Sequence, residues 1–104
     1  MILVEVQHFT GCPNSTEMIR RVKEAMQQIP FDLHYKEILV ETRELARQVN
    51  FRGSPTVLVN GIDLEYLPEP PEGNLACRYY KSGLPVIEEI KYFIIQQAGK
   101  GITE

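Results

Sequence analysis

The chain has 104 residues, of which 43% are hydrophobic and 24% are charged. This length fits one domain with its own core, and the composition is ordinary for a globular protein. The net charge of −3, without a visible basic stripe, argues against nucleic-acid binding. We therefore expect a single domain over residues 1–104.

The first residues, Met1-Ile2-Leu3-Val4-Glu5, contain neither a basic leader nor a long apolar stretch. We expect no signal peptide, no transmembrane span and no membrane partner, with the cytoplasm as the compartment. In that compartment a structural disulfide between Cys12 and Cys77 would be unusual, whereas a reactive thiol would be ordinary.

The first half of the chain alternates between strand and helix patterns. Residues 2–6 are short, apolar and β-branched, which is typical of a buried strand. Apolar residues recur at helical spacing from Met18 to Ile29, with Pro13 suited to the first turn. Residues 31–39 alternate as a second strand, and residues 42–49 carry a shorter helical pattern. The pattern predicts a βαβ unit with a right-handed crossover.

The second half predicts a hairpin followed by a closing helix. Residues 56–59 form a third strand, and Asn60-Gly61 is a strong two-residue turn into residues 62–64. Residues 68–73 are too rich in proline for regular structure and predict an exposed loop. Apolar residues from Val86 to Ala98 form a helical stripe that ends near Gly99. The expected fold class is α/β with a mixed (α+β) sheet, in the order βαβα-ββ-α.

Two local features carry the chemistry. The segment Gly11-Cys12-Pro13-Asn14-Ser15 lies between the first strand and the first helix. A thiol at a helix N-terminus is favoured as thiolate, so we expect Cys12 to be partly exposed and reactive rather than a buried core residue. The segment Arg52-Gly53-Ser54-Pro55-Thr56 introduces the third strand, and its proline is compatible with a cis peptide bond.

At these residues the chain resembles the thioredoxin superfamily. Cys12-Pro13-Asn14-Ser15 matches the family's Cys-x-x-Ser form, and Arg52-Gly53-Ser54-Pro55-Thr56 matches its cis-proline loop. The resemblance implies a thioredoxin-like fold with Cys12 as the attacking thiol. It also implies a substrate groove shaped by Pro55, in which the backbone of Ser54 pairs with the partner. The groove would be completed by Pro13 and Thr56.

The chain departs from dithiol thioredoxins at two positions. Ser15 stands where their second cysteine would be, and Gly11 stands where a tryptophan commonly precedes the reactive cysteine. A general protein-disulfide reductase is therefore not expected. The chain is also similar to a small group of uncharacterised bacterial thioredoxin-like proteins that share a later Ala-Cys-Arg-x-Tyr motif. Names in that group refer to alkylmercury lyases, but carbon–mercury cleavage is not carried over from a name.

The role of Cys77 is open between two interpretations. It is either a core residue or a distant resolving partner that the proline-rich loop brings back to Cys12. Ser15 is expected to donate a hydrogen bond to the thiolate or to cap the helix. Arg78 and Lys81 are interpreted as solvated surface charges. The spacing of Cys12, Cys77, His8 and His34 matches no metal motif, so neither a metal nor a cofactor is expected.

These observations support a thiol–disulfide exchange protein. The partner would be a thiol or disulfide of a protein or a small molecule. Cys12 would attack the partner's disulfide, and Cys77 or an external thiol would resolve the mixed disulfide that forms. The alternative is a non-enzymatic binding module for a partner segment or for a soft metal ion such as mercury. Tyr92 and Ile95 fall partly off the helical stripe, which makes a homodimer a further possibility.

Overall fold

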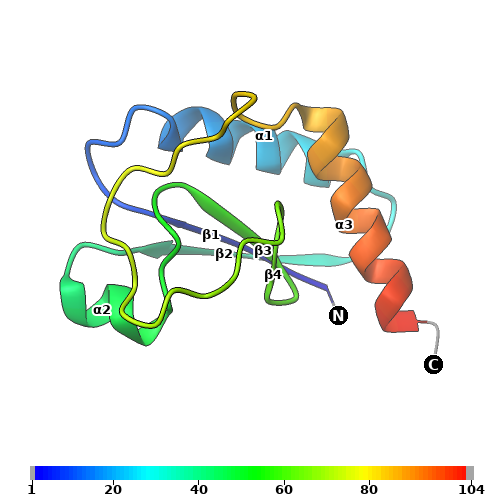
Figure 1. Ribbon diagram of the computed structural model, residues 1–104. Coiled ribbons are helices and arrows are strands. Elements are labelled where there is room, and N and C mark those ends of the chain that lie inside the picture. The colour runs from blue at the N-terminus through cyan, green and yellow to red at the C-terminus, as the bar shows by residue number, and fades with distance from the viewer. Residues whose placement is uncertain (1, 103–104) are drawn as a thin grey trace.

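The computed structural model describes residues 2–102, without the side chains of residues 101 and 102. Strands and helices follow one another as the sequence pattern predicts (Figure 1). In chain order they are β1 (Ile2–His8), α1 (Ser15–Gln27), β2 (Leu33–Leu39), α2 (Arg43–Gln48), β3 (Thr56–Val59), β4 (Ile62–Asp63) and α3 (Ile87–Ile102). The predicted element order is confirmed.

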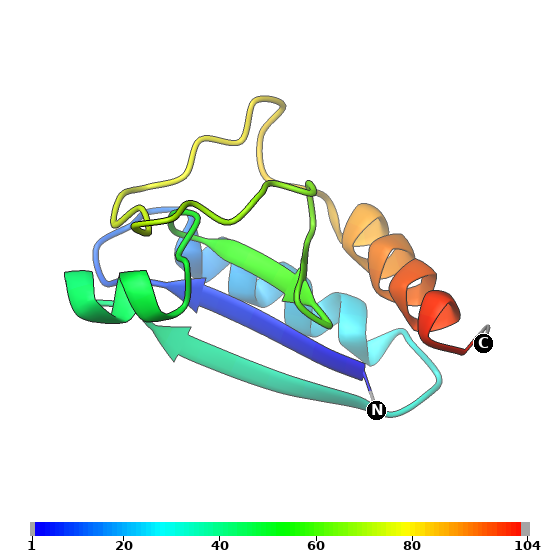
Figure 2. The ribbon, with the colours of Figure 1, turned by 60° about the horizontal axis from the view of Figure 1, so that its bottom comes forward.

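The strands form one mixed sheet in the order β2-β1-β3-β4 (Figure 2). β1 runs parallel to β2, as a βαβ unit requires, and antiparallel to β3, where Val6 pairs with Val57. β3 and β4 are joined by the predicted turn, in which Asn60 and Gly61 have φ angles of 51° and 84°. Positive φ at both central residues is the geometry that favours an Asn-Gly pair.

Helices cover both faces of the sheet. α1 and α3 lie on one face and α2 lies on the other (Figure 1). The larger core lies under α1 and α3, and the smaller core contains Val40, Ala46 and Phe51. Every second residue of β1 and β3 faces the larger core and packs against the apolar stripes of the two helices. This core contains Val4, Val6, Val57, Val59, Met18, Val22, Ala25, Ile90, Phe93 and Ile94.

Some boundaries differ from the sequence prediction. α1 begins at Ser15 with Asn14 as its N-cap, so Pro13 lies before the first turn rather than in it. α3 continues through Gly99 and Gly101 to Ile102, because a glycine costs a helix only about 1 kcal/mol and does not by itself end it. Tyr92 and Ile95 on α3 are exposed, and their part in a homodimer stays a prediction. Within residues 2–102, no helix has the length and apolarity needed to cross a bilayer.

The chain between β4 and α3 has no helix and no strand of its own. This segment passes over the end of the sheet where the β1–α1 loop leaves it (Figures 1 and 2). Its proline-rich part, residues 68–73, is largely exposed, as predicted. Its later part returns to the cis-proline loop and brings Cys77 to the candidate site.

Candidate functional site

Cys12 lies in the turn that connects β1 to α1. Gly11 adopts a φ of +93°, and the backbone N–H of Ser15 donates to the carbonyl oxygen of Cys12 at 3.2 Å. The Cys12 side chain is only 7% exposed. The expectation of a partly exposed thiol is therefore wrong, because residues of the cis-proline loop and of the returning segment contact the sulfur.

The surroundings of Cys12 favour the thiolate in spite of this burial. Burial by itself raises the pKa of the Cys12 thiol. Hydrogen bonds from the Cys77 and Ser54 side chains outweigh burial and lower the pKa below the usual cysteine value. The backbone N–H of Asn14 and the hydroxyl of Ser15 add smaller effects in the same direction. Cys12 is thus a covered thiol with several donors that favour its anion, and in its protonated form it donates to the carbonyl oxygen of Ser54.

Ser15 belongs to this donor group and does not cap α1. Its Oγ lies 2.9 Å from the Oγ of Ser54, and its side chain is buried. The N-cap position belongs to Asn14, whose side chain makes no capping hydrogen bond. Of the two expected uses of Ser15, the helix cap is absent, and its hydroxyl instead helps to lower the pKa of Cys12.

The cis-proline loop faces Cys12. The Ser54–Pro55 peptide bond is cis, and the Sγ of Cys12 lies 3.2 Å from the carbonyl oxygen of Ser54. The side chain of Thr56 is fully buried and donates to the carbonyl of Gly53, so Thr56 supports the loop from inside. Pro13 is exposed at the rim of the site.

Ser54 already has a backbone partner within the chain. Its N–H donates to the carbonyl of Ala76, and its carbonyl accepts from the N–H of Arg78, both at 2.8 Å. These two bonds make Ser54 and Cys77 a parallel β-bridge. The backbone pairing that the family resemblance reserves for a substrate is therefore taken by residues 76–78 of the same chain.

Gly53 allows this close approach. Its φ is +104°, and a Cβ atom there would lie 2.9 Å from the Cβ of Arg78 and 3.2 Å from the carbonyl oxygen of Ala76. Contacts this short do not leave room for a side chain, and the φ angle itself favours glycine. The glycine of the Arg-Gly-Ser-Pro-Thr motif thus serves the docking of residues 76–78.

Arg78 is a buried anchor rather than a surface charge, which corrects the sequence interpretation. Its side chain is 4% exposed, and its guanidinium donates hydrogen bonds to both carboxylate oxygens of Asp63, at 2.7 and 2.8 Å. It also lies over the ring of Tyr80, 4.7 Å from the centroid. Burial alone would raise the pKa of Asp63, but the bonds and charge of Arg78 keep it below its usual value. A fully paired arginine of this kind holds a loop in one place.

Cys77 is exposed, so its interpretation as a core residue is wrong. The β-bridge with Ser54 brings Cys77 near Cys12, and the two cysteines are free rather than joined in a disulfide. The hydrogen bond to Cys12, with smaller effects of desolvation and the Cys12 charge, raises the pKa of Cys77. When the pair loses one proton, the negative charge is therefore favoured on Cys12 and the remaining proton on Cys77.

The histidines lie apart from this chemistry. The Nε2 of His8 is 3.0 Å from a carboxylate oxygen of Glu37, and His34 is exposed on β2. In the described part of the chain, no three histidine, cysteine or acidic side chains gather as metal ligands would.

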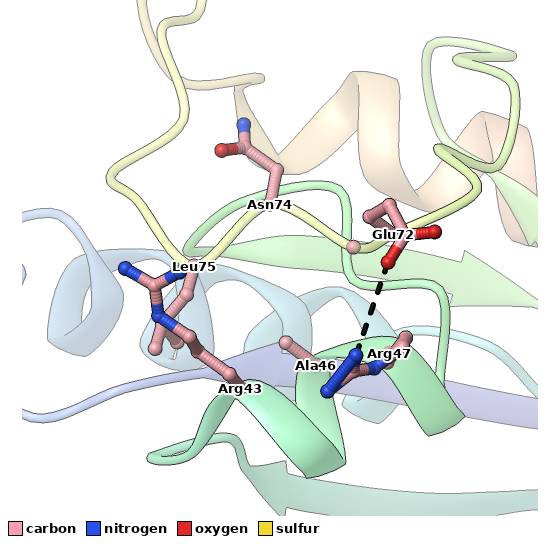
Figure 3. A pocket seen from close by; sticks show the side chains of 7 residues that line it. Arg43, Ala46, Arg47, Glu72, Asn74 and Leu75 are labelled. Carbon is pink, nitrogen blue, oxygen red and sulfur yellow. Dashed lines mark ion pairs between the residues drawn. The ribbon is translucent and has the colours of Figure 1, made fainter.

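A cavity of about 350 Å³ lies between α2 and the segment that leads to Cys77 (Figure 3). Two α2 arginines, Arg43 and Arg47, line it together with Leu75. Arg47 makes a long ion pair of 3.9 Å with exposed Glu72. The i, i+4 spacing of the arginines places both on one helix face, a signal that the sequence interpretation did not use.

Comparison with solved structures supports the fold defined by this sheet and site. The chain has a thioredoxin-like fold. It is similar to the zinc-bound form of human ERp44, with a TM-score of 0.59 and 15% sequence identity over 92% of this chain. The match covers 26% of the ERp44 chain, so this chain spans about a quarter of that protein. In sequence, the chain matches no family profile and no curated protein.

Proposed function

We propose that this protein catalyses thiol–disulfide exchange through a reversible disulfide between Cys12 and Cys77. The observation that carries the proposal is that Ser54 joins both cysteines: it forms a β-bridge with Cys77, and its carbonyl oxygen lies 3.2 Å from the Sγ of Cys12. Ser15 cannot resolve a mixed disulfide, and Cys77 supplies the missing second sulfur. A cycling disulfide of this kind suits a reducing compartment such as the cytoplasm.

The exchange is balanced by an external disulfide. The two protein thiols lose two electrons and two protons, and the external disulfide is reduced to two thiols. The lowered pKa of Cys12 makes its sulfur the first of the pair to ionise as the pH rises. In the mixed disulfide, the second protein sulfur attacks the first and forms the internal disulfide. This step is intramolecular, so it is fast relative to attack on the mixed disulfide by a second external thiol.

Treatment of the reduced protein with glutathione disulfide tests this function. Free thiols should fall from two to none, while the protein stays monomeric and loses two hydrogens in mass. Cys12→Ser and Cys77→Ser should instead stop at a mixed disulfide with glutathione, and Ser15→Ala should still form the internal bond. A wild-type protein that accumulates only mixed disulfides would rule the function out.

Binding of a soft metal ion is a second candidate, favoured by the same pair of free thiols. Thiolates are the preferred ligands of soft ions, and two neighbouring sulfurs suit a mercuric ion. Titration with mercuric chloride should then give one tight site per chain, lost in either cysteine variant. Capture of a partner segment by strand pairing is less well supported, because residues 76–78 already occupy the backbone of Ser54.

A further inference from the structure

The two sulfurs differ in how far they are open to a partner. Cys12 is 7% exposed, whereas Cys77 belongs to a run of exposed residues from Asn74 to Cys77. An attacking sulfur must approach in line with the bond that breaks, so it needs free space on the far side of the sulfur it attacks. Cys77 offers that space and Cys12 does not.

The strand edge next to Cys12 is also closed to a polypeptide partner. The N–H and carbonyl of Ser54 are both bonded within the chain. Residues 76–78 are secured on their C-terminal side by the ion pair of Arg78 with Asp63. The hydroxyl of Tyr80 adds a bond of 2.6 Å to the carbonyl of Pro55. Displacing this segment would break all these contacts together.

We propose that, within the exchange function proposed above, the external partner forms its mixed disulfide on Cys77, and Cys12 reacts with Cys77 in preference to an external thiol or disulfide. This assignment reverses the roles implied by the thioredoxin resemblance, in which Cys12 meets the partner. It also names the class of partner. A small disulfide or thiol reaches Cys77 without pairing to Ser54, whereas an extended polypeptide that needs this pairing is excluded.

The reductive half of the reaction proceeds in two displacements. An external thiolate attacks the sulfur of Cys77, a bond forms between these two sulfurs, and the Cys12–Cys77 bond breaks with its electron pair on Cys12. A second external thiolate then attacks the external sulfur and releases Cys77 as a thiolate, which takes a proton from water. Two external thiols become one disulfide, and the protein disulfide becomes two reduced cysteines. Oxidation follows the same steps in reverse.

The acidities of the pair fit this direction of attack. The sulfur with the lower pKa is the better leaving group in thiol–disulfide exchange. Donors around Cys12 lower its pKa, whereas the Cys12 contact raises that of Cys77. Attack on Cys77 therefore expels the better leaving group into a site that is already arranged to hold its negative charge.

Single-cysteine variants test the assignment whether or not the internal disulfide forms. Cys12→Ser and Cys77→Ser are each treated with glutathione disulfide over a range of pH, and rates are expressed per thiolate. The variant that keeps Cys77 should react about tenfold faster than the variant that keeps Cys12, because of exposure. Equal rates, or faster reaction at Cys12, would overturn the proposal. Circular dichroism of both variants confirms that they remain folded.

The wild-type protein provides a second measurement. The oxidised protein is mixed with glutathione, quenched in acid, alkylated and mapped by mass spectrometry. Glutathione should be found on Cys77, with the alkyl group on Cys12, and the reverse pattern would contradict the proposal.

The reduced protein should also leave the disulfides of insulin intact while it reduces glutathione disulfide. Comparable rates on insulin would contradict the assigned partner class. Failure to form any internal disulfide would instead count against the exchange function alone.

Discussion

Ser54 and Cys77 form a parallel β-bridge that closes the groove beside the cis-proline. Both backbone groups of Ser54 are bonded at 2.8 Å to neighbours of Cys77, one on each side. The bridge places a second cysteine of the same chain beside the cis-proline loop that contacts Cys12.

The ion pair of Arg78 and Asp63 is expected to hold the bridge. Arg78→Met leaves the buried Asp63 carboxylate without its partner and should lower the free energy of unfolding by about 3–5 kcal/mol. The loosened segment should also slow formation of the internal disulfide. Urea denaturation measures the first effect and the glutathione disulfide assay the second. Arg20→Met is the control, because Arg20 is exposed and its ion pairs are with Glu17 and Glu24 of its own helix.

Acid should weaken the protein through Asp63. The pKa of Asp63 is lowered in the folded state, since its bonds to Arg78 outweigh the opposing effect of burial. Its contribution to stability is therefore full above the value of about 4 for an unfolded aspartate, and is lost as the pH falls through the lower folded value. Denaturation midpoints across this range should show the loss, and Asp63→Asn should flatten this part of the profile.

Gly53 should tolerate a methyl group less well than another glycine of similar backbone geometry. Gly53→Ala places a Cβ 2.9 Å from the Cβ of Arg78, whereas Gly61→Ala meets nothing within 4 Å. Both substitutions carry the strain of a positive φ, about 1 kcal/mol. The difference in stability between the two variants therefore measures the contact with residues 76–78. Thermal unfolding should show a larger loss for Gly53→Ala. Equal losses of stability would mean that residues 76–78 shift at little cost to make room for the methyl group.

Removal of a donor should make Cys12 less acidic. The hydroxyl of Ser15 helps to lower the pKa of Cys12, so Ser15→Ala should raise it. At a pH below that pKa, alkylation of Cys12 by iodoacetamide should slow by roughly 3- to 10-fold, which corresponds to about 1 kcal/mol for one ordinary hydrogen bond. Measurement in the Cys77→Ser background isolates Cys12. Thr16→Ala, at an exposed neighbouring position, should leave the rate unchanged.

The two arginines of α2 should favour an acidic partner. Arg43 and Arg47 line the cavity whose wall includes Leu75, two residues before Cys77 (Figure 3). Glutathione disulfide, which is anionic, should lose about 2- to 5-fold in rate in an Arg43→Gln/Arg47→Gln variant, and salt should reduce the difference. Cationic cystamine should react no more slowly. Arg20→Gln on α1 is the control, and equal effects on both disulfides would remove the electrostatic explanation.

The sequence by itself determined the order of the elements and the place of Cys12. Strand and helix periodicity are local properties, and the Asn60-Gly61 turn and the Gly-Ser-Pro loop carry their geometry in their own residues. These signals were enough to predict a thioredoxin-like sheet with a thiol before its first helix. They also predicted the buried Phe93 and Ile94 stripe of α3.

Only the tertiary structure decided what surrounds that thiol. The segment that carries Cys77 has no periodic pattern, because its position depends on single long-range contacts with Ser54 and Pro55. The burial of Arg78 likewise depends on Asp63, a partner in another part of the chain, and a charged residue without a known partner is most often exposed. Proximity of distant residues and the closure of a groove are properties of the packed chain, which local sequence does not encode.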